Sequence, residues 1–99
     1  MDDSDWERER AAHEQLVDNA PSTLQPLMSD LNIGKINGDI MEDCDANDSK
    51  VMLRIIFAST HFILGMYDVE DLEGEYKRLG VKRPQKWAQK LANYVGMRR

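Results

Sequence analysis

Asp43, Asp45 and Asn47 follow one another at the spacing with which calcium-binding loops of the EF-hand type place their first three ligands. Carboxylate and amide oxygens at this spacing could hold a hard cation. The rest of that template is not met, because Asp48 replaces the glycine of the sharp turn and Arg54 replaces the glutamate that closes the cage. A cation in place of the last ligand argues against calcium, so the pattern predicts a solvated acidic loop without a metal site.

The histidines, His13 and His61, and the single cysteine, Cys44, form no ligand cluster at a recognisable spacing, and the pattern predicts no cofactor. His61 follows Arg54 by about two helical turns, so the two side chains share one narrow strip of a predicted helix. One interpretation is that Arg54 and His61 face a bound anion or a partner carboxylate. The other is that they form the solvent-facing edge of a core helix, which ordinary amphipathicity favours.

Catalytic motifs are missing from the sequence. It contains no Gly-x-Ser-x-Gly elbow and no glycine-rich phosphate loop. Asp43 and Asp45 lie in a predicted open loop, where carboxyl groups keep ordinary pKa values and are poor general acids at neutral pH. The sequence therefore predicts a protein that is not an enzyme.

Charge is sorted along the chain. Residues 1–48 carry thirteen acids and three bases, residues 49–76 five acids and two bases, and residues 77–99 eight bases and no acid. The net charge of -5 conceals the positive segment at the end. Charge of this kind bears on partners and association rates rather than on fold. The predicted basic patch consists of Lys82, Arg83, Lys86, Lys90 and Arg98, and the predicted acidic patch of Glu7, Glu9, Glu14, Asp43 and Asp45.

The basic segment 77–99 supports an alternative function, nucleic-acid binding. Trp87 and Tyr94 stand among cations, a mixture that can hold phosphates and stack bases. A helix-turn-helix register fails, because Lys86 and Gln89 would take positions that need core residues. The competing interpretation, which we favour, places both aromatic side chains in the core with the lysines extending along them to water.

The main functional prediction is a non-catalytic interaction or regulatory module that acts through protein contacts. It rests on small size, missing site chemistry and opposed charge patches. The acidic half could meet a basic partner, or the basic end of a second copy, or the basic end of its own chain. Pairing within the chain would weaken the nucleic-acid alternative.

Composition indicates one folded domain over residues 1–99, since 41% of the residues are hydrophobic and 31% charged. The acidic N-terminus does not look like a secretory signal, and a lone cysteine suits a reducing compartment, so we predict a cytoplasmic protein. The longest apolar stretch, 51–67, is shorter than the roughly 20 residues of a membrane span, so no membrane association is predicted.

The first half of the chain predicts two helices and an ambiguous segment. Ser4 and Glu7 have the spacing of a capping box, which predicts a helix over about 5–19. Its thin apolar side holds Trp6, His13 and Val17. A second, short helix follows Pro21, with apolar residues Leu24, Leu27, Met28 and Leu31, and ends at Gly34. Over 33–47, Asn37-Gly38 favours a hairpin turn, but the flanks are too short for strands, so a small hairpin and a short irregular helix are alternatives.

The second half predicts three helices. A central helix over about 49–67, capped by Asp48 or Ser49, is apolar over roughly 240° of its circumference and must be surrounded. Asp68 caps the next helix, which ends at Gly80, and Pro84 opens the last, which ends at Gly96. The inner face of the last helix holds Trp87, Ala88, Leu91, Tyr94 and Val95.

These elements predict an all-α fold, a compact bundle of four to five helices around the central one, with residues 1–4 and 97–99 frayed. The breadth of the central apolar helix also predicts a homodimer, in which a second copy covers part of it.

Overall fold

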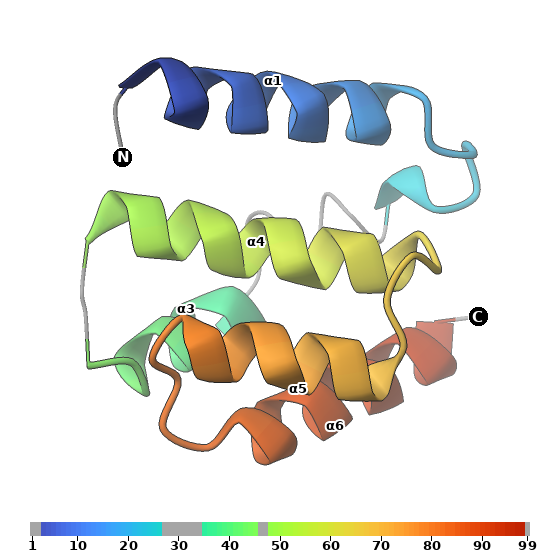
Figure 1. Cartoon of the computed structure of the whole chain (residues 1–99). Coiled ribbons are helices and arrows are strands. Elements are labelled where there is room, and N and C mark those ends of the chain that lie inside the picture. Colours follow the sequence, from blue (N-terminus) through green and yellow to red (C-terminus); the bar gives the residue numbers. More distant parts are fainter. Residues whose placement is uncertain (1–2, 27–34, 46–47, 99) are drawn as a thin grey trace.

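The structure, a computed structural model, describes residues 3–26, 35–45 and 48–98, and these ranges form a bundle of α-helices without a named strand (Figure 1). The predicted all-α bundle is thereby confirmed. The helices are α1 (Asp3–Asp18), α3 (Lys35–Glu42), α4 (Ser49–Ile63), α5 (Val69–Arg78) and α6 (Pro84–Arg98).

Helix α4 lies in the middle of the bundle, with α1 along one side and α3, α5 and α6 on the other (Figure 1). The closest packing joins α5 to α6, α3 to α4 and α4 to α5. Among the described residues, these helices contribute fully buried apolar side chains to one core, which covers part of the apolar circumference of α4 within a single chain. The largest of them are Tyr76, Ile40, Ile55, Ile63, Leu72 and Leu91.

Polar groups also lie in this core. The Ser59 hydroxyl of α4 donates to Asn37 Oδ1 of α3 at 3.3 Å and lies 2.6 Å from the Tyr76 hydroxyl of α5. Burial raises the pKa of Tyr76 far above its usual range, against the opposing effect of the Ser59 hydrogen bond. Ser59, Asn37 and Tyr76 thus each have a partner from another helix, which meets the need of buried polar groups for hydrogen bonds.

Helix α4 begins as predicted but ends four residues earlier than the predicted 49–67. Asp48 caps its start by accepting a hydrogen bond from the Val51 amide at 2.9 Å. At the other end Gly65 adopts φ of +81°. The Met66 amide then donates to the His61 carbonyl at 2.9 Å, and the Gly65 amide to Phe62 at 3.1 Å, a Schellman motif. The prediction was wrong in placing Gly65 inside the helix.

Helix α3 resolves the ambiguous segment in favour of the helical alternative and against the hairpin. Asn37 and Gly38, which favour a turn by local propensity, lie inside this helix. Burial explains the outcome, because the helical form places Ile40 in the core and brings Asn37 to Ser59. Tertiary packing outweighs the turn signal.

Two further helix ends differ from prediction, and one segment stays untested. Helix α1 begins at Asp3, so Ser4 is not the residue before it, and α6 continues through Gly96 to Arg98. Gly96 is not among the described glycines with positive φ, so it does not reverse the chain. Leu27, Met28, Leu31 and Gly34 lie outside the described residues. Fraying of 1–4 and 97–99 remains a prediction.

Helix α5 agrees with prediction at both ends. Asp68 and Asp71 form a reciprocal capping box, at 2.8 and 3.2 Å. Gly80, with φ of +91°, ends the helix in a second Schellman motif, in which the Val81 amide donates to the Tyr76 carbonyl at 3.0 Å. This turn leads the chain into α6.

Exposed apolar surface is small over the described part of the chain. Met66, at 55% exposure, is the exposed large apolar side chain there. Several apolar side chains of α4, however, are only partly buried, and the homodimer remains a prediction. No helix within 3–26, 35–45 or 48–98 combines the length and apolar character that crossing a membrane requires.

Alanine substitutions at two glycines, one inside α5 and one just after it, should change the free energy of unfolding in opposite directions. The comparison tests the left-handed turn at Gly80. An added Cβ would meet no atom within 4 Å at Gly74 or at Gly80. We expect Gly80→Ala to lower the free energy of unfolding by about 1–2 kcal/mol, because alanine is strained at positive φ. Gly74→Ala, inside α5, should raise it by about 0.5–1 kcal/mol. Urea denaturation of both variants measures this, and equal effects of the same sign would contradict the left-handed turn.

Candidate functional site

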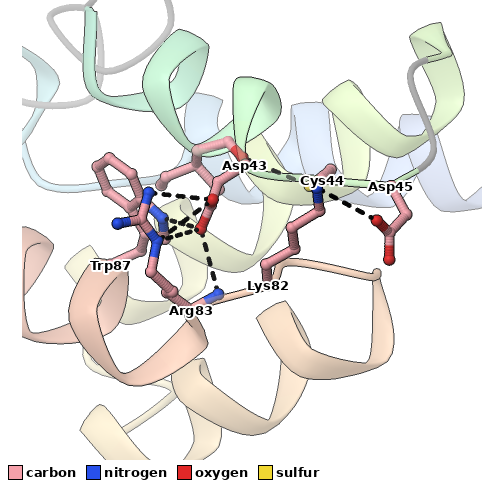
Figure 2. A network of polar contacts seen from close by, with 7 residues as sticks. Asp43, Cys44, Asp45, Lys82, Arg83 and Trp87 are labelled. Carbon is pink, nitrogen blue, oxygen red and sulfur yellow. Dashed lines mark hydrogen bonds and ion pairs between the residues drawn. The ribbon is translucent and has the colours of Figure 1, made fainter.

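The most connected polar group in the described residues is the carboxylate of Asp43, which follows α3. It accepts hydrogen bonds from the backbone amide of Arg83 at 3.1 Å and from the Arg83 guanidinium at 3.1 Å and 3.2 Å. The indole of Trp87 donates to it at 2.7 Å. Figure 2 shows Arg83 and Trp87 converging on this carboxylate from the turn before α6 and from its first turn. We call this group of three side chains the Asp43 clamp.

Backbone contacts continue the Asp43 clamp. The Lys82 amide donates to the Asp43 carbonyl at 2.9 Å, and the Asp45 amide donates to the Gly80 carbonyl at 3.3 Å. Cys44 and Val81 form an isolated antiparallel bridge between these bonds. Lys82 Nζ lies 3.6 Å from Asp45 Oδ1 (Figure 2). The segment after α3 is thus joined to the turn between α5 and α6 by both backbone and side chains.

The donors around Asp43 determine its chemistry. Hydrogen bonds from Arg83 and then from Trp87, together with the Arg83 charge, lower the pKa of its carboxyl group. The side chain is 10% exposed, while that of Arg83 is 59% exposed. An ionised carboxylate surrounded by donors has no proton to give and little freedom to bind a partner. Asp43 therefore holds two chain segments together, and the acidic loop pairs with the basic end of its own chain.

The remaining basic-patch residues lie on α6. Lys86 and Lys90 are exposed, and their Nζ atoms stand 4.9 and 5.2 Å from the centre of the Trp87 ring. Trp87 itself is only 5% exposed, as the core interpretation expects. Gln89 donates to Asn93 at 3.1 Å on the same exposed side. We call the exposed side of α6 formed by Gln85, Lys86, Gln89, Lys90 and Asn93 the lysine face. Arg98 ends the helix.

The acidic residues predicted on the first helix do not all face the same way. Glu7 and Glu14 are exposed, and Glu14 pairs with Arg10 at 3.3 Å. Glu9 instead pairs with Arg54 of α4 at 3.3 Å. The predicted acidic patch is therefore divided between the outer side of α1, the contact with α4 and the Asp43 clamp.

The predicted strip of Arg54 and His61 is partly exposed to solvent, and α1 runs along that side of α4 (Figure 1). Trp6 and His13 stack on Phe57 beside the strip, with ring centres 6.1 and 4.1 Å apart. A cavity of about 460 Å³ lies between α1, α4 and α5. The polar side chains that line it are Glu9, His13, Arg54, His61, Tyr67, Glu75 and Arg78. The carboxylate that faces Arg54 is Glu9 of the same chain, and Arg78 pairs with Glu75 at 3.3 Å.

The two histidines of this cavity differ in their bonding. His61 Nδ1 lies 2.6 Å from the Phe57 carbonyl, so it carries the proton that it donates there. His13 is 9% exposed, and its Nδ1 is buried without a hydrogen-bond partner in the described residues. Sequence reasoning placed His13 on the apolar side of its helix but did not bring it to His61, whose ring centre is 6.4 Å away. Only the fold joins positions so far apart in the chain.

A second cavity, of about 580 Å³, lies beside α3 and the start of α4, with Met41, Cys44 and Met52 in its lining. Cys44 is buried, and burial first, then the charges of Asp43 and Asp45, raise the pKa of its thiol. The thiol donates to the Ile40 carbonyl at 3.4 Å. It stays protonated at neutral pH and is a poor nucleophile.

Comparison of the chain with protein-family models, with curated proteins and with solved structures finds no match. The functional argument therefore depends on the geometry above.

Asp43 and Asp45 provide a matched pair for testing the Asp43 clamp. We expect Asp43→Asn to lower the free energy of unfolding clearly, because the charge that Arg83 and Trp87 surround is lost. Asp45→Asn should change it by less than about 0.5 kcal/mol, because its ion pair is exposed. Urea denaturation at neutral pH measures both.

The same two variants should also differ in how their stability depends on pH. Since the folded pKa of Asp43 is below its ordinary value of 3.8, its contribution is fully present above that value and is lost as pH falls through the lowered pKa. Asp43→Asn should therefore flatten the decline of stability below about pH 4, whereas Asp45→Asn should keep it. Parallel acid declines in wild type and Asp43→Asn would contradict this role.

Proposed function

We propose that the protein is a non-catalytic interaction module that binds the acidic surface of a protein partner through the lysine face of α6. The supporting observation is the exposure of Lys86 and Lys90 and the set of groups that they contact. Both are exposed, stand over a buried tryptophan, and pair with no acid in the described part of the chain, unlike Lys82 and Arg83.

The support beneath the lysine face favours binding. The Trp87 ring is held by the core on one side and by its hydrogen bond to Asp43. Two ammonium groups over one rigid ring lose less side-chain freedom on binding than lysines that extend into water. Cations presented one helical turn apart suit carboxylates on a complementary surface, which would also increase the association rate.

Protein binding fits this surface better than the alternative, nucleic-acid binding. Base stacking needs an accessible aromatic face, and Trp87 is 5% exposed with both lysines above it. Phosphate binding would also need free cations from the turn, yet Asp45 and Asp43 pair with Lys82 and Arg83. Nucleic-acid binding is therefore the second outcome that the experiment must distinguish.

Charge reversal on the lysine face tests this proposal. The protein is used to capture partners from extract of its native cells after nuclease treatment, in wild-type form and as Lys86→Glu/Lys90→Glu. We expect a protein that wild type enriches to be bound roughly tenfold more weakly by the double variant, corresponding to about 1.4 kcal/mol. Titration of the purified pair at several salt concentrations measures the ratio.

The matched control is Lys50→Glu/Lys77→Glu, which makes the same change of net charge at exposed positions on α4 and α5. It should retain binding within about twofold, because only long-range attraction is reduced. Equal loss in both double variants would place the interaction elsewhere. Capture that disappears with nuclease, with binding to duplex or single-stranded DNA that falls steeply with salt, would support the nucleic-acid alternative instead.

A further inference from the structure

Helix α1 is attached to the rest of the described bundle mainly through side chains. The closest helix pairs do not include it. Its contacts with α4 include the stacking of Trp6 and His13 on Phe57 and the ion pair between Glu9 and Arg54. The Arg54 guanidinium also lies 5.6 Å from the centre of the Trp6 ring. These few groups cover Phe57, which is 7% exposed. The docking of α1 therefore depends strongly on each of them, and on His13 most, because its ring lies 4.1 Å from that of Phe57.

The position of His13 accommodates a neutral ring and disfavours a charged one. A neutral imidazole can leave one nitrogen as an unused acceptor, but a protonated ring has two N–H donors that both need partners. Nδ1 is buried and has no partner in the described residues. A proton there would create an unsatisfied buried donor and an unpaired charge, which together oppose burial.

Neighbouring charges compensate only in part for that proton. The ionisable side chains around His13 are Glu9 and Glu14 of α1, Arg54 and His61 of α4, Tyr67 after α4, and Glu75 and Arg78 of α5. Each of the three glutamates already pairs with an arginine: Glu9 with Arg54, Glu14 with Arg10, and Glu75 with Arg78. His61, whose ring centre is 6.4 Å away, adds repulsion when it is protonated.

We propose that α1 is an acid-released cover: protonation of His13 undocks α1 from α4 and uncovers Phe57 and the cavity beside it. The rest of the bundle keeps its buried core cluster, because the Asp43 clamp and that cluster contain no residue of α1. Val17 of α1 packs against the cluster but is only partly buried. Acidification therefore exposes an aromatic face of α4 and frees an acidic helix without unfolding the domain.

The pH range in which α1 is released follows from which state, docked or released, binds more protons. Burial first, and then repulsion from His61, hold the pKa of His13 below its usual 6.5, although Glu14 acts in the opposite direction. The docked helix thus binds fewer protons than the released one. Docking is at full strength above pH 6.5 and weakens below it, by at most tenfold per pH unit, until the lowered pKa is reached.

Hydrogen exchange tests the proposal. Protection factors, which correct for the pH dependence of intrinsic exchange, are measured by mass spectrometry for peptides from α1 and α5 between about pH 7.5 and about pH 5. We expect protection of α1 to fall severalfold to tenfold while α5 keeps its protection. His13→Phe, which retains the stacking ring and removes the nitrogens, should abolish the loss, whereas His61→Gln should only move its midpoint.

Two results would overturn the proposal. One is unchanged protection of α1 in wild type, or the same loss in His13→Phe. The other is equal loss in α1 and α5, which means global unfolding. An NMR titration of the His13 Cε1 proton in the wild-type protein gives an independent test that needs no variant to fold. A measured pKa at or above 6.5 would contradict the proposal, because docking would then not oppose protonation.

Discussion

The Asp43 carboxylate is the interaction on which the arrangement of this small bundle most depends. It joins the end of α3 to the start of α6. Arg83, which donates hydrogen bonds to it, lies forty residues further along the chain. One acceptor group orients the guanidinium of Arg83 and the indole of Trp87 together. The tryptophan then occupies the core and carries the lysine face on its outer side. A charge near the surface thereby positions both a hydrophobic anchor and the candidate binding surface.

The same interaction changes the meaning of the charge sorting. Read along the chain, the basic segment has no acid within it and looks available to phosphates. In the fold, Arg83 and Lys82 pair with Asp43 and Asp45, whereas Lys77 of α5 and Lys86 and Lys90 of α6 are exposed and pair with no acid among the described residues. Part of the basic patch read from sequence is therefore engaged within the chain.

Local signals in the sequence were sufficient to predict much of the fold. Caps at Asp48 and Asp68, the left-handed Gly80 and the helix-opening Pro84 each act within a few residues, so spacing alone predicts them. The end of α4 was missed because the apolar pattern continues to Tyr67, although Gly65 stops the helix. For α3 the sequence could not decide between a helix and a hairpin, because the burial of Asn37 and Ile40 depends on distant helices. The Asp43 clamp and the stacking of His13 on Phe57 could not be predicted for the same reason, since neither leaves a periodic signal in the sequence.

The chain of hydrogen bonds through the core has a defined direction of donation. Ser59 has one proton and gives it to Asn37, so the short contact with Tyr76 must receive its proton from the phenol. The order of donation therefore runs one way, from α5 through α4 to α3. Burial opposes the formation of a phenolate at the centre of the bundle. The interior thus couples three helices through a tyrosine that burial keeps in its neutral form.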